Sequence, residues 1–304
     1  MPEPEAGPRL FAIPGWMRKH TPVLTRLIEQ LAAVRVLDCA TRLAAQAFLG
    51  GLPALFVVGT IGPDWMQDQL VSSLRAAMGL QDAALDQVLS VYAAKDPTTV
   101  TTTSAVGIIV TLASATACSR ALQRTCERSW HLPKAKAAVA AWRWLAWLTV
   151  WLAALLFQGP LQNAFGTGAV TGFLLAVVSG TLLWWWTQHL LLGARIPWLP
   201  LLPGAVLAGT GEQLLTVASK VYMPRTLNRS VDEFGSLGAV FVVLSWLITL
   251  FVVITLAIAL GYVAAHEHPL ARWLRTPPRG GGGARAARRG GGGPPPAGGG
   301  PPRS

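Results

Sequence analysis

The polar side chains that could do chemistry in this sequence lie inside a long apolar segment. Glu212 is near the middle of the run 199–223, and Thr216, Ser219 and Lys220 follow it after four, seven and eight residues. In a helix this spacing places all four side chains on one face. An ionised carboxylate at the centre of a bilayer costs about 2.5–3.5 kcal/mol on insertion scales, so Glu212 must face protein or water. The pattern predicts a polar stripe that could pass protons, a polar solute or a lipid headgroup.

A structural use of the same residues is the alternative. Polar side chains within a membrane also join neighbouring helices through hydrogen bonds, which contribute about 0.6 kcal/mol on average. On other segments, Gln46, Gln188 and His189 are the partners that we expect for Glu212, whereas Arg42 falls too near the membrane boundary. The candidate residues of a substrate path are Glu212, Thr216, Ser219, Lys220, Gln46 and His189.

The elements that must position these residues are apolar helices. The sequence is 52% hydrophobic and only 13% charged, with a mean hydropathy of +0.44, which few soluble domains reach. A helix needs about 20 apolar residues to cross about 30 Å of hydrocarbon. We therefore expect an all-α, polytopic membrane domain over residues 35–268, with a short polar link between its last two spans. The six predicted spans cover about 43–62, 101–119, 139–158, 169–192, 199–223 and 236–265.

The segment between the first two spans has a different character. Residues 64–96 contain two apolar stripes at helical spacing, interrupted at Gly79, and neither stripe is long enough to span. Five aspartates oppose only Arg75 and Lys95 in this segment. We expect two amphipathic helices on the extracytoplasmic side, because positive charge is concentrated on the cytoplasmic side of membrane proteins.

Lysine and arginine alternate in density between successive loops. With these spans, nineteen of the 25 basic residues fall on one side and five on the other, while Arg143 is inside a span. This bias predicts a multi-pass protein of the plasma (inner) membrane with both termini cytoplasmic. Residues 1–34 would form a cytoplasmic segment with an interfacial amphipathic helix. The Gly/Pro/Arg-rich tail 269–304 cannot bury a core, so we expect it to be disordered.

Other chemistry finds little support in the sequence. The adjacent His266, Glu267 and His268 point around a helix end, and no further ligand cluster completes a metal site. No glycine-rich phosphate loop precedes a Lys-Ser or Lys-Thr pair. We therefore expect no metal, no cofactor, no enzymatic activity and no specific nucleic-acid partner. Membrane lipids are the expected partners, and the oligomeric state is left open.

Several short stretches resemble one family of membrane proteins. They are Leu43 to Phe48 with Pro53, Gly107, Ser114 with Ala115, Ala121 to Trp130, Leu202 to Ala205 with Tyr222, and Gly235 to Ala239 with Trp246. Over roughly residues 35–268 the chain is similar to the YihY/BrkB family of bacterial inner-membrane proteins, formerly labelled ribonuclease BN. The resemblance implies a six-span fold with cytoplasmic termini and carries over no settled activity.

Two functions remain open from the sequence. The polar stripe favours a transporter or lipid-handling protein that uses a polar path in the membrane core. The alternative is a structural or scaffolding membrane protein without transport activity, whose partners bind the outer amphipathic helices or the inner basic segments. A hydrolase or nuclease ranks last, because no set of residues supplies a nucleophile, a base and an electrophile together.

Overall fold

The computed structural model describes residues 30–61 (except Ala33), 97–133 and 169–267, scattered positions at 63–72 and 143–154, and Leu274. Within these residues all regular structure is helical and there is no strand, which confirms the predicted all-α class. The predicted segments 1–34, 64–96, 139–158 and 269–304 lie wholly or largely outside the described residues, and these predictions stay untested.

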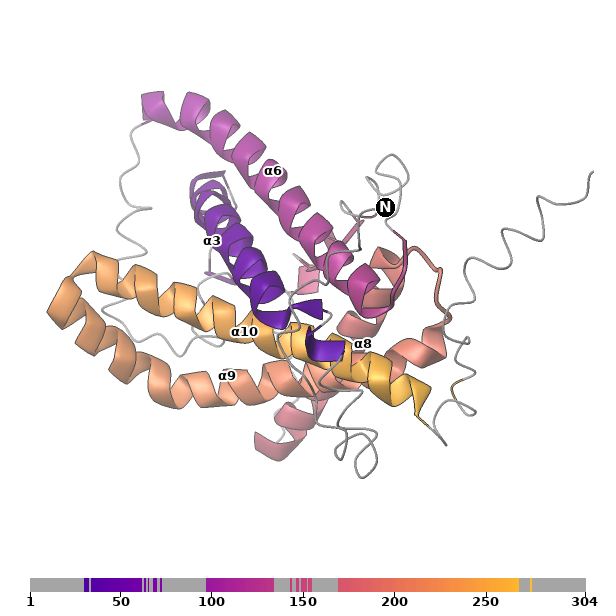
Figure 1. Cartoon of the computed structure of the whole chain (residues 1–304). Coiled ribbons are helices and arrows are strands. Elements are labelled where there is room, and N and C mark those ends of the chain that lie inside the picture. The colour runs from indigo at the N-terminus through magenta and orange to yellow at the C-terminus, as the bar shows by residue number, and fades with distance from the viewer. Residues whose placement is uncertain are drawn as a thin grey trace, which may run out of the picture.

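Five helices make up the described part of the chain (Figure 1). They are α3 (Val36–Ile61), α6 (Pro97–Ser129), α8 (Ala169–Leu191), α9 (Trp198–Phe234) and α10 (Ser236–His266). Helices α8 and α10 match two predicted spans to within a residue. Helix α3 begins seven residues before its predicted span, and α6 continues ten residues beyond its own. Apolar runs therefore locate these helices, while their polar ends extend past the apolar limits.

Helix α9 differs from the sequence-based expectation of a polar link after residue 223. It continues through Pro224 and the charged segment to Phe234, and Gly235, with φ of 62°, separates it from α10. Charged side chains on the solvated face of a helix do not end it, and Arg229 supports this one through an ion pair with Glu233 four residues later (2.9 Å). The two helices thus form one long antiparallel hairpin (Figure 1).

The helices pack in a fixed order. Helix α10 packs against α9 on one side and α3 on another, α6 lies along α3, and α8 lies along α9. Glycines permit the closest crossing: a Cβ added to Gly261 of α10 would overlap the backbone of Gly204 in α9. Small residues at such crossings let helices approach without a hydrophobic driving force between them. This crossing fixes how α9 and α10 lie relative to one another.

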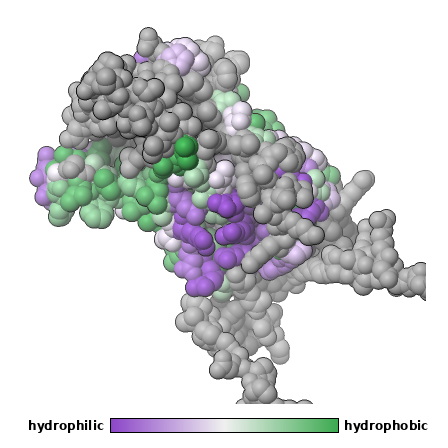
Figure 2. Space-filling view, turned by 90° about the horizontal axis from the view of Figure 1, so that it is seen from above, coloured by the Kyte–Doolittle hydropathy of each residue, from purple (hydrophilic) through white to green (hydrophobic). Residues whose placement is uncertain are grey.

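Apolar side chains cover much of the outer surface of α9 and α10. In the most apolar 18-residue stretch of α10 only 11% of the residues are buried, and in that of α9 33% are buried. Val221, Phe234, Leu237 and Phe241 are each 64% exposed. Figure 2 shows hydrophobic residues gathered on the side of the molecule where the α9–α10 turn lies. Both helices are long and apolar enough to cross a membrane, whereas the core helix of a soluble protein would be mostly buried.

Helix ends from distant parts of the sequence gather at one end of the bundle. The carboxylate of Glu127, near the end of α6, accepts a bond from Arg195 (2.5 Å) in the α8–α9 turn. Gln30, just before α3, donates to the carbonyl of Ser129 (2.9 Å). The ring of Tyr262 near the end of α10 meets Trp130 edge-on, with centroids 5.4 Å apart. The start of α3 and the ends of α6, α8 and α10 therefore lie together.

Candidate functional site

The carboxylate of Glu212 is held by a side chain from the neighbouring helix. Glu212 lies 14 residues after the start of α9, about 21 Å along a helix that rises 1.5 Å per residue. The indole Nε1–H of Trp184, on α8, donates a hydrogen bond of 2.7 Å to Glu212 Oε2. Trp184 is 2% exposed, whereas Glu212 is only partly buried. The acid therefore sits at a helix–helix contact without being sealed into a core.

Close approach of the two backbones sets this geometry. A Cβ added to Gly209 would lie 2.6 Å from the backbone nitrogen of Thr181, so α8 and α9 touch where Gly180 faces Gly209. Trp184 comes one turn after Gly180, and a helical side chain leans toward the N-terminus of its own helix. Its indole consequently reaches Glu212, which comes one turn after the glycine on α9.

A second tryptophan supports the first. The ring of Trp151 meets that of Trp184 edge-on at 5.2 Å, and its own Nε1–H donates to Thr187 Oγ1 (3.1 Å). Edge-to-face aromatic pairs contribute about 0.5–1.5 kcal/mol beyond their buried area. The indole that binds Glu212 is thus held in place by packing.

The three polar residues that follow Glu212 divide between different environments. The hydroxyl of Thr216 donates to the carbonyl of Glu212 (2.9 Å), and that of Ser219 donates to the carbonyl of Thr216 (2.9 Å). Ser219 is fully buried and Lys220 is exposed. The hydroxyls therefore donate within their own helix, as serine and threonine often do in membranes.

The structure does not join the expected partners on other helices to Glu212. Gln46 lies on α3, which packs mainly on α6 and α10, and its Oε1 has no hydrogen-bond partner within the described ranges. Gln188 is 1% exposed and faces Gly204. It lies one helical turn after Trp184 on α8. The ring of His189 stacks on Trp198, with centroids 3.8 Å apart. Gln188 and His189 lie near the α8–α9 turn and make no described bond to the acid.

Sequence reasoning missed Trp184 as the partner of Glu212. A signal was available, because a buried indole usually finds an acceptor for its N–H, and the apolar α8 offers few acceptors of its own. The sequence instead favours another role for this residue, because three consecutive tryptophans, at 184 to 186, are typical of residues at the membrane–water interface. The partner depends on the register between α8 and α9, which a single sequence does not reveal.

His266, at the end of α10, has a local partner. His266 Nδ1 donates to the carbonyl of Tyr262 (2.8 Å), and its ring lies 4.3 Å from that of Tyr262. In the part of the chain that the structure describes, no three His, Cys, Asp or Glu side chains are grouped as metal ligands. The cysteines Cys39, Cys118 and Cys126 are free thiols.

The described part of the chain is all-helical, and two of its helices are apolar, largely uncovered and long enough to cross a membrane. Together with the family match that follows, they indicate that this chain is a membrane protein. It belongs to the Virulence factor BrkB family, whose sequence model matches residues 27–277. This confirms the resemblance found in the first span, the second span and the α9–α10 hairpin. Comparison with curated proteins and with solved structures gave no match.

Proposed function

We propose that this protein is a transporter or lipid-handling protein of the plasma (inner) membrane that uses Glu212 in a polar path. We also propose that the chain crosses the membrane six times, with both termini in the cytoplasm. The start of α3 lies together with the ends of α6, α8 and α10, which supports this topology. In the six-span order an even number of crossings separates each of these helix ends from the next, so all four fall on the same side of the membrane. The charge bias between the two sides supports the orientation.

The observation that carries the proposal is the incomplete satisfaction of Glu212. A carboxylate can accept about four hydrogen bonds, and the described residues supply one, from Trp184. An acid used only to join helices would be expected to be covered and fully bonded, since an uncompensated charge in hydrocarbon is costly. A partly buried acid with acceptor capacity to spare suits a proton, a polar solute or a headgroup that arrives and leaves.

A scaffolding role is the second candidate, and one observation favours it. The hydroxyls of Thr216 and Ser219 donate hydrogen bonds to backbone carbonyls of α9. They therefore have fewer hydrogen-bond donors free for a passing substrate than their spacing in the sequence suggests. In that case the bond between Trp184 and Glu212 serves helix packing. We propose no enzymatic activity and no cofactor under either candidate.

The test compares Glu212→Gln with the unaltered protein in reconstituted vesicles. Glutamine keeps the size of the side chain and an acceptor oxygen for Trp184, but it can neither ionise nor carry a proton. Movement of fluorescent phosphatidylglycerol between leaflets would be followed by dithionite quenching, with and without a pH gradient. Transport predicts that Glu212→Gln slows this movement at unchanged protein abundance.

Two controls separate the candidates. Trp184→Phe removes the donor while keeping a buried ring, so it reports on packing around the acid. Deletion of residues 64–96 removes the proposed outer helices. If Glu212→Gln lowers only stability, while the deletion abolishes the cellular function, the scaffolding role holds and transport is contradicted.

A further inference from the structure

A groove between the first turns of α3 and the last turns of α6 gathers positive charge. Its volume is about 180 Å³. The charged and polar residues that line it are Arg35, Asp38, Arg42, Arg124, Thr125 and Arg128. We call this site the arginine groove. Four guanidinium groups face one carboxylate here, which leaves an excess of three positive charges in a small space.

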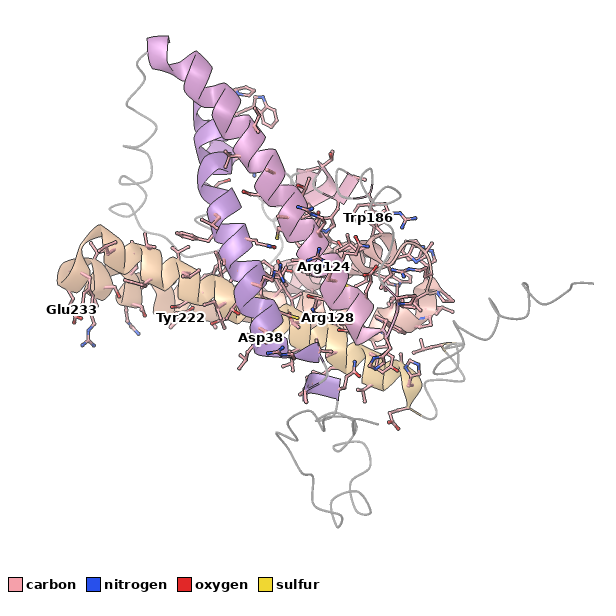
Figure 3. All side chains as sticks on the ribbon, turned by 45° about the horizontal axis from the view of Figure 1, so that its top comes forward. Asp38, Arg124, Arg128, Trp186, Tyr222 and Glu233 are labelled. Carbon is pink, nitrogen blue, oxygen red and sulfur yellow. The ribbon has the colours of Figure 1, made fainter. Side chains whose placement is uncertain are left out.

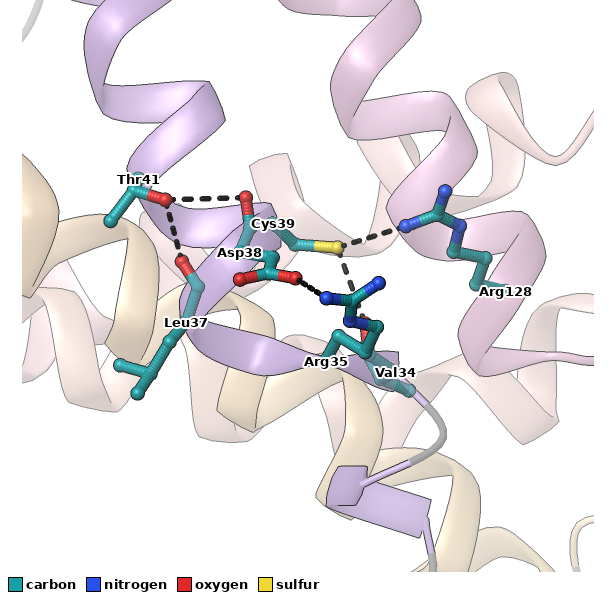
Figure 4. A network of polar contacts seen from close by, with 7 residues as sticks. All are labelled: Val34, Arg35, Leu37, Asp38, Cys39, Thr41 and Arg128. Atoms are coloured by element: carbon teal, nitrogen blue, oxygen red, sulfur yellow. Dashed lines mark hydrogen bonds and ion pairs between the residues drawn. The ribbon is translucent and has the colours of Figure 1, made fainter. Parts of the chain in front are cut away.

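Two of the arginines have protein partners. Arg35 forms an ion pair with Asp38 (2.6 Å), and Arg128 Nη1 donates to the sulfur of Cys39 (3.5 Å), as Figure 4 shows. A thiol sulfur is a weak acceptor and does not neutralise a guanidinium. Arg128 therefore keeps its full charge at the wall of the groove.

The other two arginines have donors to spare. Arg42 and Arg124 are exposed, and neither makes a hydrogen bond or ion pair with the residues that the structure describes. Figure 3 shows Arg124 and Arg128 on α6 close to Asp38 on α3. Arginines four residues apart on one helix repel each other by about 0.2–0.5 kcal/mol, a cost that a bound anion would offset. Guanidinium forks match the oxygens of a phosphate in particular.

Exposed apolar side chains lie farther along the same two helices. Leu49, 64% exposed, comes seven residues after Arg42, about 10 Å along α3. Ile109, 66% exposed, comes 15 residues before Arg124, about 22 Å along α6. A ligand with an anionic head in the groove and a long apolar tail would reach exposed apolar side chains on both helices. A soluble anion would use only the head site.

We infer that the arginine groove binds the phosphate headgroup of an anionic phospholipid of the cytoplasmic leaflet. Arg42 and Arg124 hold the phosphate oxygens, Arg35 and Arg128 supply the surrounding field, and the acyl chains lie along Leu49 and Ile109. Basic pockets between helices at the cytoplasmic membrane surface bind anionic headgroups in this way. The inference rests on the proposed placement of α3 and α6 in the membrane, and it does not require that lipid is moved.

The test measures lipid binding to the purified full-length protein by native mass spectrometry. Phosphatidylglycerol and phosphatidylcholine, which share a phosphodiester but differ in net charge, are titrated in parallel. We expect a clear preference for phosphatidylglycerol. Arg42→Gln with Arg124→Gln should weaken that binding roughly thirtyfold, since each basic residue near an anionic lipid surface contributes about a factor of five.

A matched pair of substitutions controls for total charge. Arg225→Gln with Arg229→Gln removes the same two charges from the far part of α9 and should leave binding unchanged. Arg42→Lys with Arg124→Lys keeps the charge and should retain most of the affinity, which also shows that changes at these positions leave the protein folded.

Three outcomes would overturn the inference. The first is equal binding of the two lipids, and the second is equal loss in the two glutamine pairs. The third is displacement of phosphatidylglycerol by inorganic phosphate at comparable concentration, which would make free phosphate the ligand. A protein that binds phosphatidylglycerol in the groove and yet moves no lipid would keep this inference and contradict the movement of lipid along the Glu212 path.

Discussion

Glu127 and Arg195 lie 68 residues apart in the sequence, and their side chains meet at 2.5 Å. Glu127 is 3% exposed and also accepts a bond from Gln123 (3.0 Å). Arg195 further donates to the carbonyls of Leu192 and Pro133. One guanidinium thus ties the end of α6 to the turn between α8 and α9.

Arg195→Gln should destabilise the protein by about 2–4 kcal/mol, because it leaves the buried Glu127 without its counter-charge. The lower end allows for the partial exposure of Arg195, whose side chain is 29% accessible. The midpoint of thermal unfolding in detergent measures the effect. Arg229→Gln removes an equal charge from the exposed pair with Glu233 and should change the midpoint little. Equal shifts in the two variants would show that net charge, and not this pair, determines stability.

The bond between Trp184 and Glu212 should appear as a coupling energy. Trp184→Phe, Glu212→Leu and the combined variant form a double-mutant cycle, which removes the separate packing losses of each change. We expect a coupling of about 0.6 kcal/mol and at most about 1.7 kcal/mol, the average and the maximum of hydrogen bonds between membrane helices. Unfolding in mixed micelles supplies the four stabilities. Additive losses would mean that the bond contributes nothing.

Gly261→Ala should loosen the crossing of α9 and α10. The new methyl group would overlap the Cα and N of Gly204, and overpacking of this kind costs about 1–3 kcal/mol. Gly172→Ala in α8 is the control, since nothing lies within 4 Å of its added Cβ and alanine favours a helix. The loss should be visible as a lower unfolding midpoint for Gly261→Ala alone. Tolerance of alanine at 261 would argue against the close crossing.

Cys126 should resist thiol reagents at neutral and mildly alkaline pH. It lies beyond the predicted span 101–119, and burial, together with the neighbouring charge of Glu127, raises the pKa of its thiol from 9.0 to about 12. At pH 8 about one thiol in ten thousand is then ionised, and the thiolate is the reactive form. Maleimide labelling of a Cys39→Ala, Cys118→Ala protein from pH 7 to 9 should stay low until detergent denaturation exposes the thiol. Fast labelling of the folded protein would show that the end of α6 opens.

The orientation can be tested with single cysteines. In a background with the three native cysteines replaced by serine, Asp232→Cys at the α9–α10 turn should react with a membrane-impermeant maleimide added to intact cells. Asp38→Cys should react only after the cells are opened, because the proposed orientation, based on the excess of basic residues, has the start of α3 on the cytoplasmic side. Both positions are exposed, so accessibility within the protein does not separate them. The opposite pattern would invert the topology.

Apolar run length was a good guide to α8 and α10 because few polar residues interrupt either helix. It fails after residue 223, because a polar composition predicts a link there, whereas Arg225 to Glu233 continue α9 as a solvated helix. Hydropathy reports the solvent around a segment and not its backbone conformation.

Contacts between helices could not be predicted from the sequence. Glu212 could be singled out as an unusual acid, but its bond to Trp184 depends on a register set where Gly180 meets Gly209. The arginine groove likewise joins Arg42 and Arg124, which stand 82 positions apart. Charge counting had placed both arginines on the inner side, and only the packing of α3 on α6 brings them to one site.

The length of α9 has a mechanical consequence. At 37 residues it is about 55 Å long, so a hydrocarbon layer of about 30 Å leaves a substantial part of it standing in water. That emergent part belongs to the same rod as Glu212, 22 residues from Phe234. Pro224 removes one backbone hydrogen bond between the tip and the acid, so a load applied to the tip by a neighbouring protein or by the cell wall would reach Glu212 and its indole only through this weakened turn.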